Sequence, residues 1–361
     1  MSQKYKETPE QSLFDEKMMR RALYLAQRGL GSVSTNPMVG SVITHNGKII
    51  GEGFHREFGK SHAEVIAIQS VKQRKLISDS TLYVNLEPCS HHGKTPPCAD
   101  LIIKKGIKRV VIGTTDTYSE VSGRGVEMLK SAGIDVKVGV LEKECRFLNR
   151  RFFTYNEKKR PYIILKWAET ADGFLDKLRS LNSNEKPQWI TNDESRVLVH
   201  RWRTEEDSIL IGSNTALLDN PSLNVRFTSG RNPQRIVLDQ QGNLPHNLNI
   251  FNKTQPTILF TTQPNNYNKL SITVEQISTE TSLQEILSRL YSLKIQSIIV
   301  EGGLQVLNSF IEQDLWDEMR RFIGVRNFGN GVAAPKIHFT HNEHISVGNC
   351  SLYFYFNKQM L

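Results

Sequence analysis

Long apolar segments are missing from this sequence, and their absence bears first on membrane proteins. No stretch approaches the roughly 18 consecutive apolar residues that a membrane-spanning helix needs. The opening residues, MSQKYKETPEQS, also lack the apolar core of a secretory signal peptide. We therefore expect a cytoplasmic protein without a membrane partner.

Cysteine is scarce: the 361 residues include only Cys89, Cys98, Cys145 and Cys350. Disulfide frameworks belong to small secreted domains, so we do not expect one in a cytoplasmic chain of this length. Cys89 and Cys98 lie close together in the sequence, in a segment that also contains prolines and two histidines. That context favours metal binding over redox chemistry.

Long runs of like charge, internal repeats and low-complexity tracts are absent too. The formal net charge of +9 would suit nucleic acid or an anionic substrate, and it is equally compatible with a solvated basic surface. Because there is no run of about five or six like charges, the sequence gives no indication of a nucleic-acid-binding tail. We expect no nucleic-acid partner.

The remaining composition is that of an ordinary globular protein, with 38% hydrophobic and 23% charged residues. The length corresponds to about two or three domains. Residues 142–160 are rich in charge, and the stretch from Asn156 to Pro161 is the best candidate boundary. The sequence therefore predicts one domain over residues 1–156 and a second over residues 157–361.

Both halves alternate strand and helix patterns, which favours layered α/β domains. In the first half, Asn46-Gly47 is a strong turn signal between two β-rich runs. There we expect helices over 13–29, 63–74 and 123–134, a hairpin over 39–54, and strands over 81–87, 108–114 and 135–140. In the second half we expect strands over 161–168, 208–212, 235–239, 257–261 and 297–303.

Three residues of the first half have the chemistry of a catalytic zinc site. His62 opens an expected helix, and Cys89 and Cys98 follow an expected strand. One imidazole and two thiolates fill three tetrahedral positions and leave the fourth to water, whose pKa zinc lowers towards neutrality. Glu64 can face that water without binding the metal and can pass its proton to a departing amine. This His-x-Glu and Pro-Cys arrangement is typical of zinc deaminases.

Two features of this segment leave alternatives open. His91 and His92 are rival ligands, since they lie between the two cysteines. Eight residues separate Cys89 from Cys98, whereas nucleic-acid and nucleoside deaminases have two residues between their cysteines. The spacing therefore argues against a nucleoside or tRNA deaminase joined to an unrelated second half. A zinc-stabilised RNA-binding protein would need closed metal coordination and clustered arginine and aromatic residues, and we find neither.

Four strings give the first half a close resemblance to a known family. They are NPMVGSVI from Asn36, GEGFH from Gly51, HAE from His62 and LEPCSHHGKTPPC ending at Cys98. They resemble the deaminase domain of the bifunctional riboflavin-biosynthesis diaminohydroxyphosphoribosylaminopyrimidine deaminase/reductase family. The resemblance implies a cytidine-deaminase-like fold. It also implies that Asn36 holds the nucleotide-like substrate and that Lys94 reaches its phosphate.

The second half resembles the reductase domain of the same family through LKWAETADG, QWIT, RTEEDSILIGSNTALLDNPSLNVR, RIVLD and VEGG. The resemblance implies a dihydrofolate-reductase-like fold and NADPH as the cofactor. The residues that it assigns to the cofactor are Glu169, Trp189, Thr215, Asp219, Gly302, Gly303, Leu304, Gln305, Val306, Leu307, Asn308 and Ser309. Those that it assigns to the substrate are Lys166, Arg203, Leu223, Arg226 and Glu301.

One part of this assignment also has a physical basis. The string SIIVEGGLQVLNSFI predicts a strand, a glycine turn and a helix. Gly302 and Gly303 would let the backbone approach a pyrophosphate, which the N-terminus of a helix attracts. No GxGxxG string is present, so a Rossmann domain is not expected.

The chain departs from the family pattern at several places, including the far C-terminal string RRFIGVRNFGNGVAAP, which matches it poorly. Residues 169–174 read ETADGF where many members read ASLDGR. Pro187 and Gln240 stand where serines are expected. These departures concern individual cofactor and substrate contacts in the second half.

Taken together, the residues and the resemblance predict two consecutive reactions on a small phosphorylated pyrimidine. The first is zinc-dependent hydrolysis of an exocyclic amine of a diaminopyrimidinone ribosylamine phosphate. The second is reduction of the ribosyl group to ribityl with NADPH. Whether the chain forms a homo-oligomer is left open.

Overall fold

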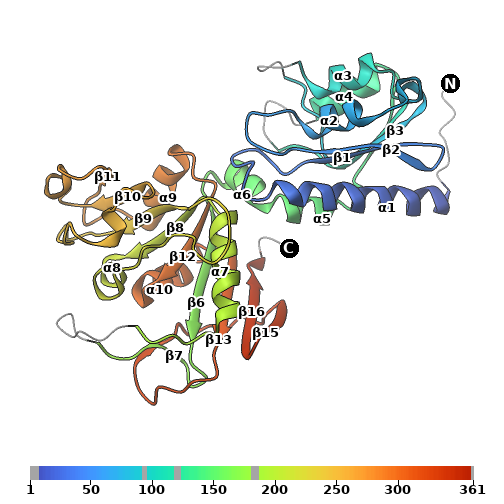
Figure 1. Cartoon of the computed structure of the whole chain (residues 1–361). Helices are drawn as coiled ribbons and strands as arrows, with labels where there is room; N and C mark the ends of the chain where they lie inside the picture. The colour runs from blue at the N-terminus through green and yellow to red at the C-terminus, as the bar shows by residue number, and fades with distance from the viewer. Residues whose placement is uncertain (1–7, 92–95, 118–122, 180–186, 359–361) are drawn as a thin grey trace. The chain divides into compact units, whose positions relative to one another are not determined.

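The computed structural model describes residues 8–91, 96–117, 123–179 and 187–358 (Figure 1). The chain divides into two compact units, Met1–Lys158 and Lys159–Leu361. Each unit is a sheet with helices packed against it. None of the helices in the described part of the chain has both the length and the apolar character needed to cross a membrane.

The first unit is built on a five-stranded sheet in the order β2-β1-β3-β4-β5. Strand β1 is antiparallel to β2 and β3, whereas β3, β4 and β5 are parallel. The strands are β1 (Gly40–His45), β2 (Lys48–Phe54), β3 (Thr81–Leu86), β4 (Arg109–Thr114) and β5 (Asp135–Val138). The helices are α1 (Pro9–Ala26), α2 (Ala63–Ser70), α3 (Cys98–Lys104), α4 (Arg124–Ser131), α5 (Glu142–Leu148) and α6 (Arg150–Lys158).

Successive side chains of each strand point to opposite faces of this sheet, and each face forms its own hydrophobic core. Ile43, Leu82 and Ile112 pack with helices α2, α3 and α4 on one face. Val42 and Tyr83 pack with α1 and α5 on the other. Figure 1 shows these two helical layers on opposite sides of the strands. The layered α/β arrangement predicted for the first half is therefore confirmed.

The hairpin at residues 39–54 forms as predicted. Its loop consists of Asn46 and Gly47, with φ values of 48° and 71°. Two successive residues with positive φ match the right-handed twist of the flanking strands, which is why Asn-Gly is favoured there.

Each of the three expected helices differs at one end or both, and two of these boundaries have a visible cause. Helix α1 begins at Pro9, because Thr8 caps it by accepting a hydrogen bond from the Gln11 amide. Helix α2 ends at Ser70 rather than at residue 74. The Ser70 hydroxyl donates to the Ala67 carbonyl at 2.7 Å and accepts from the Glu52 amide at 2.9 Å, which ties the helix end to β2. Serine favours such local bonds over helix continuation.

The second unit contains a nine-stranded sheet in the order β11-β10-β9-β8-β12-β6-β13-β16-β15. The first seven strands of this order, which run from β11 at the edge to β13, are parallel to their neighbours. Strand β16 is antiparallel to β13, and β15 is antiparallel to β16. The strands are β6 (Tyr162–Glu169), β8 (Ser208–Gly212), β9 (Gln234–Leu238), β10 (Thr257–Thr261), β11 (Thr273–Gln276), β12 (Ser297–Gly302), β13 (Glu318–Ile323), β15 (Glu343–Val347) and β16 (Cys350–Phe356). Strands β7 (Phe174–Asp176) and β14 (Val332–Ala333) pair separately.

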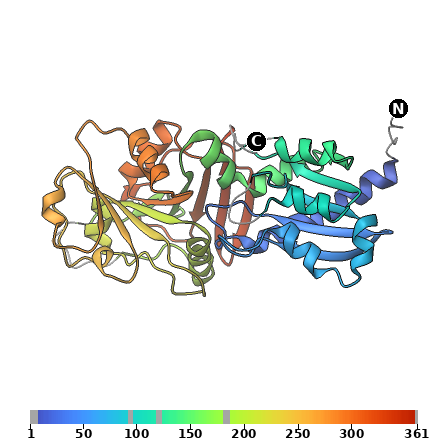
Figure 2. The same cartoon turned by 90° about the horizontal axis from the view of Figure 1, so that it is seen from above.

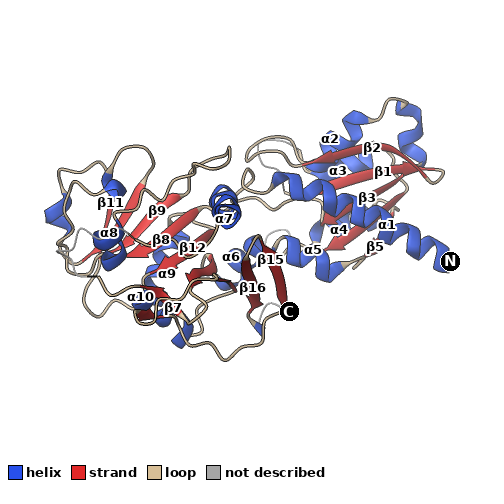
Figure 3. Cartoon of the chain, turned by 60° about the horizontal axis from the view of Figure 1, so that its bottom comes forward, coloured by secondary structure: helices blue, strands red, loops and turns tan. Residues whose placement is uncertain are grey.

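Helices cover both faces of this sheet. Helices α9 (Leu283–Ser292) and α10 (Leu304–Glu312) pack on one face, where Ile163, Leu210 and Val300 point. Helices α7 (Asp193–Glu205) and α8 (Ser213–Asp219) pack on the other. The two layers are visible within this unit in Figures 2 and 3. The five strands predicted in this half are β6, β8, β9, β10 and β12, whereas β7, β11 and the strands after β12 were not predicted.

We predict that Gly40 is required for the packing of α1 on β1. A Cβ atom at this position would lie 2.1 Å from the Ala22 carbonyl oxygen and 2.8 Å from the Ala26 nitrogen. Backbone atoms cannot move aside, so Gly40→Ala should lower the free energy of unfolding by about 1–3 kcal/mol, measured by urea denaturation.

Gly47→Asn is the matched control. It has no heavy atom within 4 Å of its Cβ position, and asparagine tolerates the left-handed conformation. It should change stability by less than about 0.5 kcal/mol. Equal effects of the two substitutions would contradict the packing argument.

Candidate active sites

The expected metal ligands of the first unit lie at the ends of secondary-structure elements. His62 is the N-cap residue of α2, and Cys98 is the first residue of α3. Cys89 follows β3 in the intervening loop. These elements converge because α2 and α3 pack on the same face of the sheet.

The three side chains form a compact donor group. Their donor atoms all lie within 4.8 Å of one another, and within the described residues no other group of three or more such ligands occurs. His62 Nδ1 is 3.5 Å from Cys89 Sγ and 3.3 Å from Cys98 Sγ. One imidazole nitrogen and two sulfurs are the donors that tetrahedral zinc prefers, so the residues present fit this metal.

Hydrogen bonding helps to keep a thiolate in the group. The Cys98 thiol donates to the Cys89 sulfur and, with further bonds from His62 and the Cys98 amide, lowers the pKa of Cys89 against the effect of burial. The same bond and burial raise the pKa of Cys98. An ionised sulfur next to a neutral one is ready to bind a cation, because metal binding requires the thiolate.

Glu64 lies beside this group in the first turn of α2 and is only 3% exposed. Burial raises the pKa of Glu64 to about 7, and the neighbouring Cys89 sulfur adds to this effect. A carboxyl group with a pKa near neutrality can both accept and donate a proton at working pH.

Of the two rival ligands, the structure describes only His91, which does not join the group. His91 is exposed. His92 and Lys94 lie outside the described residues, so the structure does not address the phosphate contact expected of Lys94.

Asn36 contacts His55, and the ring of His55 lies beside the ring of the expected metal ligand His62. The Asn36 side-chain nitrogen is 3.1 Å from His55 Nε2, and the rings of His55 and His62 are 5.7 Å apart. Burial lowers the pKa of His55, which favours the neutral ring. His55 is the last residue of the GEGFH string, but no role in the site was predicted for it from the sequence. Its position directly after β2, the strand on which α2 packs, was the available signal.

Glu87 was also missed. Its carboxylate is 4% exposed and accepts four backbone hydrogen bonds of 2.9–3.2 Å. The donors are the amides of Asp116, Gly123, Gly125 and Val126. Glu87 therefore ties the segment that precedes Cys89 to the start of α4.

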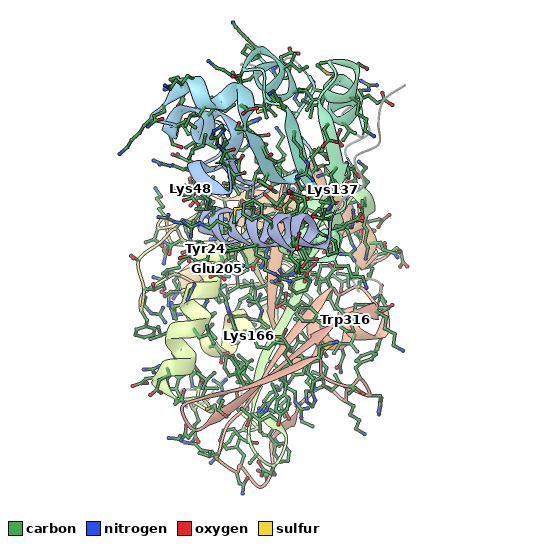
Figure 4. All side chains as sticks on the ribbon, turned by 90° about the vertical axis from the view of Figure 1, so that its right-hand side faces the viewer. Tyr24, Lys48, Lys137, Lys166, Glu205 and Trp316 are labelled. Carbon is green, nitrogen blue, oxygen red and sulfur yellow. The ribbon has the colours of Figure 1, made fainter. Side chains whose placement is uncertain are left out.

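In the second unit, three of the expected substrate residues meet. Lys166 is on β6, Arg203 on α7 and Glu301 on β12; Lys166 is labelled in Figure 4. Arg203 Nη2 donates to Glu301 Oε2 at 2.9 Å. Burial acts to raise the pKa of Glu301, but Arg203 and Lys166 outweigh it and lower the pKa to about 2. Burial lowers the pKa of Lys166.

The segment after α8 brings Arg226 to the same place. The Arg226 amide donates to His200 Nδ1 at 3.0 Å, and its guanidinium donates to the Asn224 side chain at 2.6 Å. The Asn224 carbonyl accepts from Arg203 at 3.1 Å. Leu223 is 3% exposed, with a φ of 53°.

His200 is a further residue that the sequence did not single out. Burial, reinforced by the charges of Arg203 and Arg226, lowers its pKa to about 4. The ring is therefore neutral near pH 7, and Nδ1 stays available as the acceptor for Arg226. The available signal was its position three residues before Arg203, because residues at this spacing lie on the same side of a helix.

The glycine turn expected to contact the cofactor lies at the start of α10. Gly302 has a φ of 112°, a conformation that favours glycine. A Cβ on Gly303 would lie 3.1 Å from Thr215 Oγ1, so the turn lies close to α8. Together with the N-terminus of α10, this close backbone approach fits a pyrophosphate group.

Other expected cofactor residues have different surroundings. Glu169 is buried, and its carboxylate accepts from Arg321 at 2.5 Å and from the Trp167 indole at 2.8 Å. Leu307 is 1% exposed and packs in the core beneath the sheet. Asp219 shares Arg179 with Asp176. These contacts leave Glu169 and Leu307 inside the protein.

Further residues of this group lie at the surface. Trp189 is 58% exposed. Pro187 and Gln240, where serines were expected, are exposed as well. Among the residues from Leu304 to Ser309, Gln305 is exposed and the others besides Leu307 are half-buried.

Comparison with known proteins places both units in one family. Residues 161–346 match the RibD C-terminal domain, and residues 12–114 match the cytidine and deoxycytidylate deaminase zinc-binding region. The riboflavin biosynthesis protein RibD of Aquifex aeolicus is 43% identical over 324 residues, which cover 88% of this chain and 89% of that protein. The chain belongs to the RibD family.

Solved structures agree with this assignment. A diaminohydroxyphosphoribosylaminopyrimidine deaminase/5-amino-6-(5-phosphoribosylamino)uracil reductase from Thermotoga maritima is 39% identical, with a TM-score of 0.85 over 95% of this chain and 98% of that one. RibD of Acinetobacter baumannii is 30% identical, with a TM-score of 0.85 over 96% and 99%. The RibD relationship confirms the predicted fold classes, and it contradicts the alternative of a deaminase with an unrelated second half.

We predict that Cys98→Ser removes zinc from the protein. Serine offers a hard oxygen that stays protonated, in place of a soft thiolate. After dialysis, metal analysis should fall from about one zinc per chain to well below half, because two ligands remain.

Cys350→Ser in the second unit is the matched control, since this buried cysteine lies outside the donor group. It should keep the zinc content of the unaltered chain. Full zinc retention by Cys98→Ser would exclude Cys98 as a ligand and make His91 or His92 the next candidate.

Proposed function

We propose that residues 1–156 hydrolyse an exocyclic amine of 2,5-diamino-6-ribosylamino-4(3H)-pyrimidinone 5′-phosphate. Residues 157–361 would then reduce the ribosyl group of the product to ribityl. The observation that carries this proposal is the group of His62, Cys89 and Cys98 with the buried Glu64 beside it, in a chain of the RibD family. The relatives' two named activities support the order of the reactions.

In the first reaction, His62, Cys89 and Cys98 would hold zinc, and Asn36 would orient the substrate. When bound, zinc supplies Lewis acidity that lowers the pKa of a water molecule. Glu64, buried beside the three ligands, would accept a proton from water and deliver it to the departing amine. Glu87 keeps the Cys89 segment in place during the reaction.

In the second reaction, the turn at Gly302 and Gly303 would receive the pyrophosphate of NADPH. When bound, NADPH supplies the hydride that reduces the opened ribose. Arg203 and Arg226 bind the substrate, because guanidinium groups pair well with phosphate. Lys166 faces the reacting ribose, and Glu301 fixes the orientation of Arg203.

One assay tests the two activities together. Purified protein is given the diaminopyrimidine substrate and NADPH, and ammonia release is followed alongside NADPH absorbance. Release of ammonia followed by oxidation of NADPH is expected. Ammonia release without NADPH oxidation would contradict the second half of the proposal and direct attention to Glu169, Pro187 and Gln240.

We predict that Glu64→Gln slows ammonia release about 10²–10⁴-fold, because glutamine keeps the shape and cannot shuttle a proton. The zinc content should not change. Glu127→Gln, at an exposed position of α4, is the matched control and should be fully active. A loss below tenfold would exclude Glu64 as the proton shuttle.

We also predict that Gly303→Val weakens NADPH binding by at least about tenfold, equivalent to about 1.4 kcal/mol. The added side chain would occupy the space next to Thr215 that the cofactor needs. Titration of NADPH by fluorescence measures this effect, and ammonia release from the same sample reports whether the first unit is intact. Unchanged NADPH affinity would remove the glycine turn from the cofactor site.

A further inference from the structure

One face of α7 points towards the candidate reductase site. Arg196, His200 and Arg203 are spaced at i, i+4 and i+7, so they lie along the same side of this helix. His200 holds the Arg226 amide, and Arg203 holds Glu301. Arg196 is the third residue on this face, and neither the sequence motifs nor the family resemblance assigns it a role.

The guanidinium of Arg196 is held between two aromatic rings. Its central carbon lies 4.9 Å from the ring centroid of Trp189 and 5.2 Å from that of Phe227. Phe227 in turn packs edge-on against His200, with ring centroids 4.7 Å apart. Such packing fixes a planar cation in one orientation.

Despite this fixed position, the hydrogen-bonding capacity of Arg196 is not fully used. Its Nε atom is buried and has no hydrogen-bond partner among the residues that the structure describes. Its ion pair is with Asp193, whose side chain is 85% exposed. Exposed pairs contribute little, so the pair with Asp193 leaves the charge of Arg196 available to a stronger anionic partner.

The charges around Arg226 point in the same direction. Arg196 and Arg226 lie over the same ring, with their guanidinium carbons 5.2 and 5.8 Å from the centroid of Phe227. Burial lowers the pKa of Arg226, and the positive charges of Arg203 and Arg196 lower it further. The side chain of Arg226 donates to the neutral amide of Asn224. The buried carboxylate of Glu301 is already paired with Arg203. Arg196 and Arg226 therefore repel one another, and no acidic side chain in the described residues is recorded as pairing with both of them. Such a pair of cations forms a favourable place for an anion.

We propose that Arg196 is a third arginine of the reductase site and that, with Arg226, it binds a phosphate monoester dianion. This inference rests on the proposed function of the second unit. A dianion would accept from the terminal nitrogens of Arg196 in place of the exposed Asp193 carboxylate, and it would relieve the repulsion between the two guanidinium groups. The phosphate belongs either to the sugar of the substrate or to the 2′ position of NADPH, and the two sources share this chemistry.

The test compares Arg196→Met with Arg201→Met. Methionine retains much of the apolar stem but removes the charge and the donors. Arg201 lies on the same helix, and its side chain is 70% exposed and paired with Glu205, so it is a matched control. For each variant, kcat and KM of the reductase step are measured with the phosphorylated intermediate and with the same intermediate after phosphatase treatment. Both are repeated with NADPH and with NADH.

Loss of a charged hydrogen bond to phosphate corresponds to a change of about 10–100-fold in binding. If the phosphate is that of the substrate, Arg196→Met should raise KM by this factor for the phosphorylated intermediate only, with little change in kcat. If it is that of the cofactor, the preference for NADPH over NADH should fall by this factor instead. Arg196→Lys should restore part of the lost binding, since it returns the charge without the planar donors.

Several outcomes would overturn the inference. Equal effects of Arg196→Met on phosphorylated and dephosphorylated substrate, combined with an unchanged preference for NADPH, would show that no phosphate is bound there. The same conclusion follows if Arg196→Met behaves like Arg201→Met. Ammonia release from each sample shows whether the first unit is intact. Failure of the unaltered chain to oxidise NADPH would instead contradict the proposed function itself.

Discussion

The close approach of α2 to β2 is the constraint on which the first unit depends. Cβ atoms at Gly51 and Gly53 would lie 2.5–2.6 Å from backbone atoms of α2, so the helix can rest directly on the strand only because these residues are glycines. This contact fixes the start of α2 and therefore both His62 and Glu64. The cysteines come from the loop after β3 and the start of α3, and they reach the same place because α3 packs on the same face. The three donor atoms therefore lie within 4.8 Å of one another.

The second unit relies on a different interaction, the buried ion pair of Arg203 and Glu301. Both side chains are little exposed, at 10% and 12%, and breaking such a pair leaves an uncompensated charge. The pair positions Arg203, whose other donor holds the Asn224 carbonyl. The Arg226 segment is thereby fixed at two points, with His200 providing the second. Positive charge is concentrated here, although the net charge of the whole chain gave no indication of its location.

Much of the fold could be predicted because the signals are local. Asn46-Gly47 specifies its turn by backbone conformation alone, and the apolar runs of β6, β8 and β12 suit strands buried on both faces. The C-terminal strands β13, β15 and β16 were missed. Strand β13 carries Glu318, Arg320 and Arg321, whose charges are compensated by ion pairs that form only in the folded protein. A sequence pattern cannot show that compensation.

The sequence by itself determined the chemistry of the metal site, because ligand type, ligand number and the neighbouring acid all lie in short strings around His62 and Cys89. It also identified the family, through strings that extend over both halves. Only the tertiary structure showed how the residues that the resemblance assigns to the substrate contact one another, and it added His200 and Arg196 beside them. Lys166, Arg196, Arg226 and Glu301 come from different elements, and their proximity depends on how strands and helices cross. It likewise placed Glu169 in a buried ion pair, since a side chain's partners are set by packing rather than by its position in a motif.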